Sequence, residues 1–388
     1  MARRLKKVKI NKFWKNIFSN KPLIWIVVIL LLAVVFGNKH ISQYFQPESS
    51  QAAATQWDLK RVTSWGGRTI VTDVDDGWLA FKWVPTTTPS GTAAPLVYKL
   101  SSNLDDPTFI RWTNANESHV AVDGPRINNG NVVWAEAKWN GKNMDTLIFS
   151  YDIYYGQKVK AVTNDPGLKS GLDIYGQYIS YYQYPVGDTT RPTELVVRNI
   201  LGSDVRRIPR QGGNATEFVY STFMENNRVF WIEKSISGSN YKTYMYNVGT
   251  KQIVPAPIPT DLNISWPDVN GNMIVAGIKN NIYALDYIKG VMQTVTTGTA
   301  VNQFPKVWDN LVTYIRAAGP TGTIQEVHLY NLSDKTDNPI LSIDTAKDKV
   351  HLDFDNYIIT KSAWKKAILA GSLFFDDKNS DLYVATQP

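Results

Sequence analysis

The sequence predicts an all-β protein, a β-propeller of seven four-stranded blades, preceded by one transmembrane helix. Three observations lead to this prediction. Beyond residue 56 the chain consists of short apolar runs rich in Val, Ile, Tyr and Trp, which favour strands. One strand-and-turn element recurs seven times along that part. An uncharged apolar run of 16 residues comes before it.

The N-terminal part is predicted to be a basic tail followed by a membrane span. Residues 1–21 hold eight Lys and Arg and no acid, and residues 22–37 carry no charge. At the rise of an α-helix the second segment is about 24 Å long, near the ~30 Å hydrocarbon core of a bilayer. Because flanking positive charges stay in the cytoplasm, we expect a cytoplasmic N-terminus and a large domain outside.

Aromatic and lysine side chains around this run are typical of membrane interfaces. The predicted interface residues are Trp14, Phe18, Lys21, Trp25 and Lys39. Aromatic and apolar residues of the tail recur at helical spacing among lysines, which fits either an in-plane helix or a disordered basic tail. Residues 38–56 read as a linker. A cleaved signal peptide is the alternative to the retained anchor, but the small residues of a cleavage site do not follow closely.

From residue 57 to 388 the recurrent element is a turn pair followed by an apolar strand. Gly, Asn and Asp tolerate the backbone angles of tight hairpin turns. The pairs are Asp76-Gly77, Asn129-Gly130, Tyr175-Gly176, Asn226-Asn227, Asn270-Gly271, Asp309-Asn310 and Asp355-Asn356. Their second members are 53, 46, 51, 44, 39 and 46 residues apart. A period of roughly 40–50 residues with several strands in each unit indicates propeller blades.

The two ends of this region are predicted to close the ring together. The final unit has strands near 350–354, 357–361 and 382–385, and no fourth strand follows. The early segment 58–63 (DLKRVT) resembles the outer strands KVKAVT and MQTVT. We therefore expect this segment to supply the missing outer strand, which leaves no open edge. Residues 364–378 exceed what the blade needs and read as an insertion with a helical turn.

These units resemble the TolB-type and WD40-like propeller repeats of prokaryotic envelope proteins. The likeness is carried by ISWPDVNGNMIVAG at 264–277, DIYGQYISYY at 173–182 and NIYALDYIKG at 281–290. It covers about residues 57–388 and its motifs are mainly structural. The resemblance implies a ring-shaped binding domain at the cell envelope and brings no catalytic residue with it.

Charge and cysteine content exclude several classes of protein. The net charge is +7, but removal of the eight basic residues of the tail leaves 33 bases against 34 acids. The large domain thus has no net positive field for a nucleic acid. Because the chain has no cysteine, it can form neither a disulfide nor a zinc-thiolate site.

Candidate sites for chemistry are few. The four histidines (His40, His119, His328 and His351) are scattered, and no Gly-x-Ser-x-Gly elbow occurs. Asp377, Asn379 and Asp381 resemble the start of a calcium loop, but Leu382 stands at the glycine position and no room remains for the distal Glu. These residues, like the Asp73–Gly77 cluster, are predicted to form solvated turns. No metal, cofactor or catalytic residue is expected.

The function expected from these features is a binding or scaffolding platform, not an enzyme. The chain would be tethered to a bilayer, with the propeller on the periplasmic or extracellular side, and would bind another envelope protein or a glycan. Two alternatives remain open. One is a module that binds surface or cell-wall glycans. The other is a carbohydrate-active enzyme, whose paired carboxylates a sequence cannot reveal.

Overall fold

The computed structural model describes residues 57–387, except 65, 76, 86–93, 101–108, 112–118, 141–142, 157, 203, 239, 257, 259–263, 319–322, 349–350, 362–365 and 377–378. The chain divides into two units, Met1–Ala54 and Thr55–Pro388. The predicted tail (1–21), membrane span (22–37) and linker (38–56), with their interface residues, lie outside the described part. Within the described ranges no helix has the length and apolarity needed to cross a membrane.

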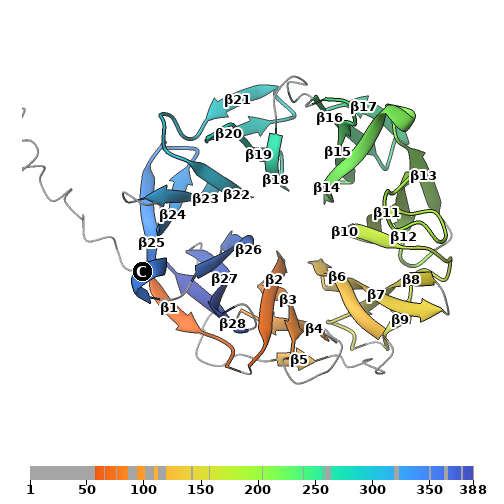
Figure 1. The fold of residues 1–388 in the computed structure, drawn as a ribbon, viewed down its shortest axis with the longest axis horizontal. Helices are drawn as coiled ribbons and strands as arrows, with labels where there is room; N and C mark the ends of the chain where they lie inside the picture. The colour runs from red at the N-terminus through yellow and green to blue at the C-terminus, as the bar shows by residue number, and fades with distance from the viewer. Residues whose placement is uncertain are drawn as a thin grey trace, which may run out of the picture. The chain divides into compact units, whose positions relative to one another are not determined.

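Seven four-stranded antiparallel sheets surround a central opening (Figure 1). Blade 1 contains β2 (Arg68–Asp75), β3 (Trp78–Val84), β4 (Ala94–Lys99) and β5 (Phe109–Arg111). Blade 2 contains β6 (His119–Asn128), β7 (Asn131–Asn140), β8 (Asn143–Asp152) and β9 (Lys160–Ala161). Blade 3 contains β10 (Lys169–Tyr175), β11 (Tyr178–Gln183), β12 (Glu194–Asn199) and β13 (Val205–Pro209). The first strand of each blade lies innermost, next to the opening.

The remaining blades repeat this order. Blade 4 follows the short helix η1 (Gly213–Ala215) and contains β14 (Thr216–Glu225), β15 (Arg228–Ser235), β16 (Tyr241–Asn247) and β17 (Gln252–Pro255). Blade 5 contains β18 (Ile264–Asn270), β19 (Met273–Ile278), β20 (Asn281–Asp286) and β21 (Val291–Thr294). Blade 6 contains β22 (Asn302–Trp308), β23 (Leu311–Ala318), β24 (Ile324–Asn331) and β25 (Asp337–Asp344), and helix α3 (Thr345–Asp348) follows it. Blade 7 contains β26 (His351–Lys361), β27 (Ala367–Asp376), β28 (Asn379–Thr386) and, as its outer strand, β1 (Asp58–Arg61).

The predicted ring closure is confirmed. Strand β1 pairs antiparallel with β28, from Asp58 opposite Thr386 to Arg61 opposite Tyr383. The resemblance of DLKRVT to the other outer strands has a structural basis in its threonine. Thr63 accepts the N–H of Leu382 at 2.9 Å, just as Thr163 accepts that of Ile148 at 2.9 Å and Thr296 that of Ile282 at 2.8 Å.

The interior of the last blade differs from the prediction. The two expected strands near 350–354 and 357–361 are one strand, β26, and the pair Asp355-Asn356 lies inside it. A register shift between Leu352 and Tyr357 explains the turn-like residues, because a bulge also suits Asp and Asn. The supposed insertion 364–378 contains β27, the second strand of the blade. The other six turn pairs lie at or within one residue of the turns between first and second strands.

The core is divided among the blade boundaries. In the described residues we find seven apolar clusters, one at each junction between neighbouring blades, including the junction of blades 7 and 1. Second strands such as β3 (WLAFKWV) are apolar on both faces because each face packs against a blade. Trp134 and Trp231, both fully buried, belong to such second strands. The ring is therefore held by side-chain packing all the way around.

Candidate functional site: the central channel

The inner strands enclose a central cavity of about 830 Å³. Its lining comes from β2, β6, β10, β14, β18, β22 and β26, so every blade contributes to it. Cavities of this size are common binding sites in proteins. Because this one lies on the axis of a rigid ring, its shape is fixed by the packing of all seven blades.

Bulges in the inner strands turn large side chains toward the channel. Strands β14, β18 and β22 each show a register shift, where Tyr220, Trp266 and Phe304 have φ values of 62°, 47° and 53°. Positive φ in bulky residues costs about 1–3 kcal/mol each. The rings of Trp266 and Phe304 are 4.2 Å apart between centroids. All three aromatic residues line the cavity, which gives blades 4 to 6 an aromatic wall.

A ring of charged residues lies near the C-terminal ends of the inner strands. We call Asp73, Arg126, Asp173, Asp268 and Lys306 the inner ring; each stands two residues before the end of its strand. Its carboxylates bridge neighbouring blades. Asp73 accepts the N–H of Ile127 at 2.8 Å, and Asp268 accepts that of Val307 at 2.8 Å. The backbone edge of one inner strand is thus held by a side chain of the preceding blade.

Arg126 lies among the acids of the inner ring. Its Nε donates to the carbonyl of Leu172 at 3.1 Å, and its Nη1 donates to the carbonyl of Thr72. Burial lowers the pKa of Arg126, but the charges of Asp173 and Asp73 outweigh this and raise it. Burial raises the pKa values of Asp73 and Asp173, against the opposing charge of Arg126. One buried cation therefore interacts electrostatically with two carboxylates from two other blades.

A second ring lies at the ends of the inner strands. We call it the mouth ring; its members are the last residues of β2, β6, β10, β14, β18 and β22, namely Asp75, Asn128, Tyr175, Glu225, Asn270 and Trp308. They also bridge blades. Asn128 accepts the N–H of Gly176 at 2.7 Å, Asn270 accepts that of Asp309 at 2.8 Å, and Asp75 accepts that of Asn129.

The mouth ring contains acids, amides and aromatic rings but no lysine or arginine. Burial raises the pKa of Glu225 to about 7. Hydrogen bonds from the backbone of Gly271 and Asn226 lower it, whereas the charges of Asp75 and Asp268 raise it further. Burial raises the pKa of Tyr175 as well, and the charges of Glu225 and Asp75 add to this effect.

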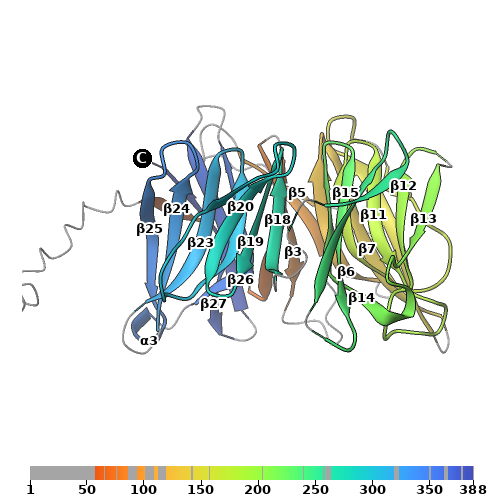
Figure 2. The ribbon, with the colours of Figure 1, turned by 90° about the horizontal axis from the view of Figure 1, so that it is seen from above.

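The turns next to the mouth ring are rigid and carry apolar side chains. The third strands of blades 2 to 6 end in Asp or Asn. The side chain accepts N–H groups of the following turn, as Asp152 does from Tyr154 at 2.9 Å and Asn199 from Leu201 at 2.8 Å. First and third strands of a blade run in the same direction, so these turns share one side of the ring with the mouth ring. We call this side the turn face; it is opposite to α3 (Figure 2).

Four large apolar side chains are exposed at these turns. Tyr155 is 78% exposed, Leu201 66%, Ile288 54% and Tyr154 51%. Tyr154 and Tyr155 belong to blade 2, Leu201 to blade 3 and Ile288 to blade 5. We refer to these four residues as the turn tips.

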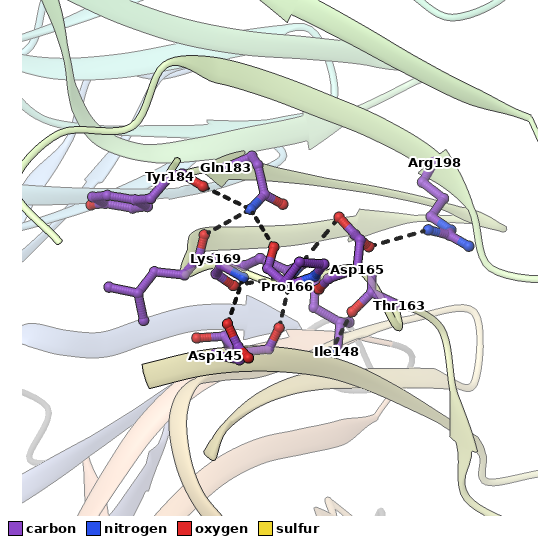
Figure 3. Close-up of polar contacts among 12 residues, drawn as sticks. Asp145, Ile148, Thr163, Asp165, Pro166, Lys169, Gln183, Tyr184 and Arg198 are labelled. Carbon is purple, nitrogen blue, oxygen red and sulfur yellow. Dashed lines mark hydrogen bonds and ion pairs between the residues drawn. The ribbon is translucent and has the colours of Figure 1, made fainter. Parts of the chain in front are cut away.

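A buried lysine outside the cavity lining joins blades 2 and 3, with the contacts drawn in Figure 3. Lys169 Nζ donates to the carbonyls of Thr146 at 2.9 Å, Asp165 at 2.8 Å and Gly167 at 3.1 Å. Burial lowers the pKa of Lys169, and the charge of Asp165 opposes this. Gln183 binds the same loop from β11 through the carbonyl of Pro166 at 3.2 Å. The ammonium group fixes the loop that leads into the inner strand of blade 3.

His328 is also held by its own blade. It is 4% exposed, and its two ring nitrogens lie 3.1 Å from Asp337 and 3.3 Å from Glu326. Burial alone raises the pKa of Asp337, but hydrogen bonds from His328 and Tyr314 outweigh it and the pKa lies below its ordinary value. His328 therefore has a structural position.

The acidic clusters singled out in the sequence are not solvated turns. Asn379 and Asp381 lie in β28; Asn379 accepts the N–H of Gly67 at 2.9 Å, and Asp381, 5% exposed, contacts Arg61 and Thr63. They fasten the ring closure. Asp377 lies outside the described residues. Asp73 and Asp75 belong to β2 and to the two rings. No group of three His, Cys, Asp or Glu in the described part is placed to hold a metal.

Sequence reasoning missed Arg126 and the mouth ring. The signal was present, since each mouth-ring residue is at or directly before one of the recurrent turn pairs. The sequence could not predict that these six positions converge on the axis of one ring.

Comparison with known proteins supports the fold. No protein-family model and no curated protein matches the sequence. An acylaminoacyl peptidase in complex with Z-Gly-Gly-Phe-chloromethyl ketone aligns with a TM-score of 0.57 and 10% identity, over 85% of this chain and 52% of that one. A prolyl endopeptidase aligns with a TM-score of 0.54 and 11% identity, over 90% of this chain and 54% of that one. The β-propeller domain of the Trilobed protease from Pyrococcus furiosus aligns with a TM-score of 0.57 and 9% identity, over 83% of this chain and 94% of that one.

The chain thus spans about half the length of the first two peptidases and nearly all of the third propeller domain. At such low identity the likeness shows the seven-bladed fold alone. The expected relation to TolB-type and WD40-like repeats stays a prediction.

Proposed function

We propose that this protein is a membrane-tethered platform that holds a protein partner on the turn face of its propeller, outside the cytoplasm. The observation that carries the proposal is the set of exposed apolar turn tips. Rigid aromatic and aliphatic anchors are typical of residues that dominate protein interfaces. Backbone N–H groups of these turns donate hydrogen bonds to Asp and Asn side chains and hold the turns before binding, so little conformational entropy is lost when a partner docks.

The location rests on the N-terminal sequence and on the resemblance of the repeats. The basic tail at 1–21 and the apolar run at 22–37 favour a single-pass anchor with the propeller outside. The likeness of the repeats to those of TolB-type envelope proteins leads us to infer a prokaryotic cell envelope.

Differential capture from native membranes tests the proposal. Full-length protein is cross-linked to its neighbours, and wild type is compared with the double variant Tyr155→Ser and Leu201→Ser. Val186→Ser is the matched control, because Val186 is 60% exposed in the loop between β11 and β12, on the opposite face. We expect one partner to be retained by wild type and control and lost by the double variant. Equal capture by all three proteins would refute the proposal.

The glycan-binding and enzyme alternatives need separate assays with the same protein. Binding of wild type on a glycan array with no protein captured would favour a glycan-binding module. Turnover of a polysaccharide by the full chain would identify an enzyme.

A further inference from the structure

Two blades carry bulky aromatic residues at a position where two other blades carry glycine. The residue four places before the end of the inner strand is Gly124 in β6 and Gly171 in β10, with φ values of 75° and 66°. In β18 and β22 the same place holds Trp266 and Phe304, with φ values of 47° and 53°. All four positions lie within register shifts. Because glycine adopts these angles freely and a bulky residue is strained, the bulge itself does not require an aromatic side chain.

Packing in the core explains only part of this choice. Phe304 contacts the apolar cluster between blades 6 and 7, but Trp266 belongs to none of the seven clusters in the described residues. Its ring lies against that of Phe304 instead, and both residues line the cavity. Tyr220 of blade 4 is 38% exposed, and its hydroxyl donates to the carbonyl of Ile264 at 2.9 Å. We call Tyr220, Trp266 and Phe304 the aromatic wall.

The aromatic wall lies on the far side of the inner ring from the turn face. Trp266 and Phe304 come two residues before Asp268 and Lys306 in their strands, and these strands end at the mouth ring. From the turn face inward, the order along the channel is therefore mouth ring, inner ring and aromatic wall. A ligand held at the wall leaves the turn tips free.

The polar groups beside the wall suit a neutral ligand with several oxygen atoms. Trp266 and Lys306 line the cavity, and neither the indole N–H nor the ammonium group donates a hydrogen bond within the described residues. The charge of Lys306 acts on Asp268. Acids and bases alternate in the inner ring from blade to blade, so a small ion of either sign meets both attraction and repulsion there.

We propose that the aromatic wall binds a neutral sugar ring. A pyranose has a flat face of C–H groups and an edge of hydroxyl groups. The C–H face packs on the electron-rich faces of the aromatic rings, and the hydroxyl edge accepts a hydrogen bond from the ammonium group of Lys306. The indole N–H of Trp266 is a donor for the next sugar unit. This site goes beyond the proposed function, because the propeller holds its protein partner on the turn face and the sugar inside the channel.

Titration with trisaccharides and two control ligands tests the inference. The full-length chain is kept in a polyoxyethylene detergent, whose headgroup contains no sugar. Cellotriose, maltotriose and triacetylchitotriose are added while tryptophan fluorescence and heat are recorded. We expect at least one of them to bind about tenfold more tightly than sorbitol, which has hydroxyl groups but no flat C–H face, and than adenosine, a flat aromatic ligand. Binding of no trisaccharide, or tighter binding of adenosine, would overturn the inference.

Substitutions locate the sugar and separate binding from packing. Trp266→Gly and Phe304→Ala should each weaken the best trisaccharide about tenfold. Tyr283→Ala is the matched control and should leave the affinity unchanged, because Tyr283 is half-buried in the same blade as Trp266 and does not line the cavity. Since glycine relieves the backbone strain, Trp266→Gly should melt within about 5 °C of wild type. Wild-type affinity in Trp266→Gly contradicts the proposal; if that variant does not fold, Phe304→Ala decides in the same way.

Capture of the protein partner distinguishes this site from the proposed function. Trp266→Gly should capture the partner as wild type does, because the wall lies beyond the inner ring. Loss of both the partner and the trisaccharide would mean that a single site spans the channel, and the separate sugar site would be wrong. Capture of a partner by a wild-type protein that binds no trisaccharide leaves the platform standing and refutes the sugar site alone.

Discussion

Removal of residues 57–63 should open the propeller. Trp57 is 6% exposed and packs between blades 6 and 7, where its burial is worth about 3 kcal/mol. Val62 packs at the junction of blades 7 and 1 and adds about 1 kcal/mol. Hydrogen bonds add about 1 kcal/mol each. They are the ladder between β1 and β28, the bond from the Val62 N–H to the Leu382 carbonyl at 2.7 Å and the contacts of Thr63. Leu59, 40% exposed, contributes little.

The total is on the order of 8 kcal/mol, comparable with the ~5–15 kcal/mol that stabilises a typical domain. We therefore expect the deleted chain to lose its cooperative thermal transition, or to melt far below wild type, when near-ultraviolet circular dichroism is followed with temperature. Deletion of the linker residues 46–54 is the control and should leave the midpoint unchanged. Equal melting of the two deletions would refute closure by β1.

A point substitution keeps the test informative if the deletion does not fold. Thr63→Val removes the acceptor of the Leu382 N–H, and Thr163→Val removes the equivalent acceptor inside the continuous blade 2. Each should lower the free energy of unfolding by about 1–3 kcal/mol. A loss with Thr163→Val and none with Thr63→Val would show that the N-terminal strand is not docked.

Three further outcomes are expected. Burial raises the pKa of Glu225 from 4.5 to about 7, so the stability contributed by its protonated form is fully present below pH 4.5 and is lost as the pH rises through 7. Glu225→Gln should therefore flatten part of the decline in melting temperature between pH 5 and 8. An unchanged slope would contradict this. Lys169→Met removes the ammonium donor of three carbonyls, of which, within the described residues, only that of Gly167 keeps a hydrogen bond from the N–H of Thr146. It should cost about 2–4 kcal/mol in urea denaturation, whereas Lys158→Met, at an exposed position, should cost almost nothing; similar losses would rule out the buried clamp. Protease added to spheroplasts should digest residues 57–388, because the charge around 22–37 directs the N-terminus inward; complete protection would reverse the topology.

The strands and their number could be predicted because their signals are local. A turn between first and second strands needs residues that accept tight backbone angles, and a second strand needs apolar residues on both faces. Both requirements act over a few neighbouring residues and recur with the blade. The prediction failed in blade 7, where Asp355-Asn356 marks a bulge instead of a turn, since the same residue types satisfy either geometry.

The closing strand was predictable for a different reason. The Val-Thr ending of DLKRVT has a defined task in an outer strand, in which Thr63 binds a backbone N–H of the third strand. The same task is performed by Thr163 and Thr296, so the sequence likeness reflects a shared hydrogen bond.

The sequence by itself determined the period, the strands and the residues that end each inner strand. Only the tertiary structure decided which of those residues meet. Asp73 and Asp173 are 100 positions apart, yet one guanidinium, that of Arg126 from the blade between them, acts on both. Their encounter depends on the curvature of the ring, which is the sum of seven packed blade junctions and is encoded in no local segment. The same holds for Asp75 and Glu225, which are the last residues of two different inner strands. The charge of Asp75 raises the pKa of Glu225 only because the closed ring brings the two strands around one channel.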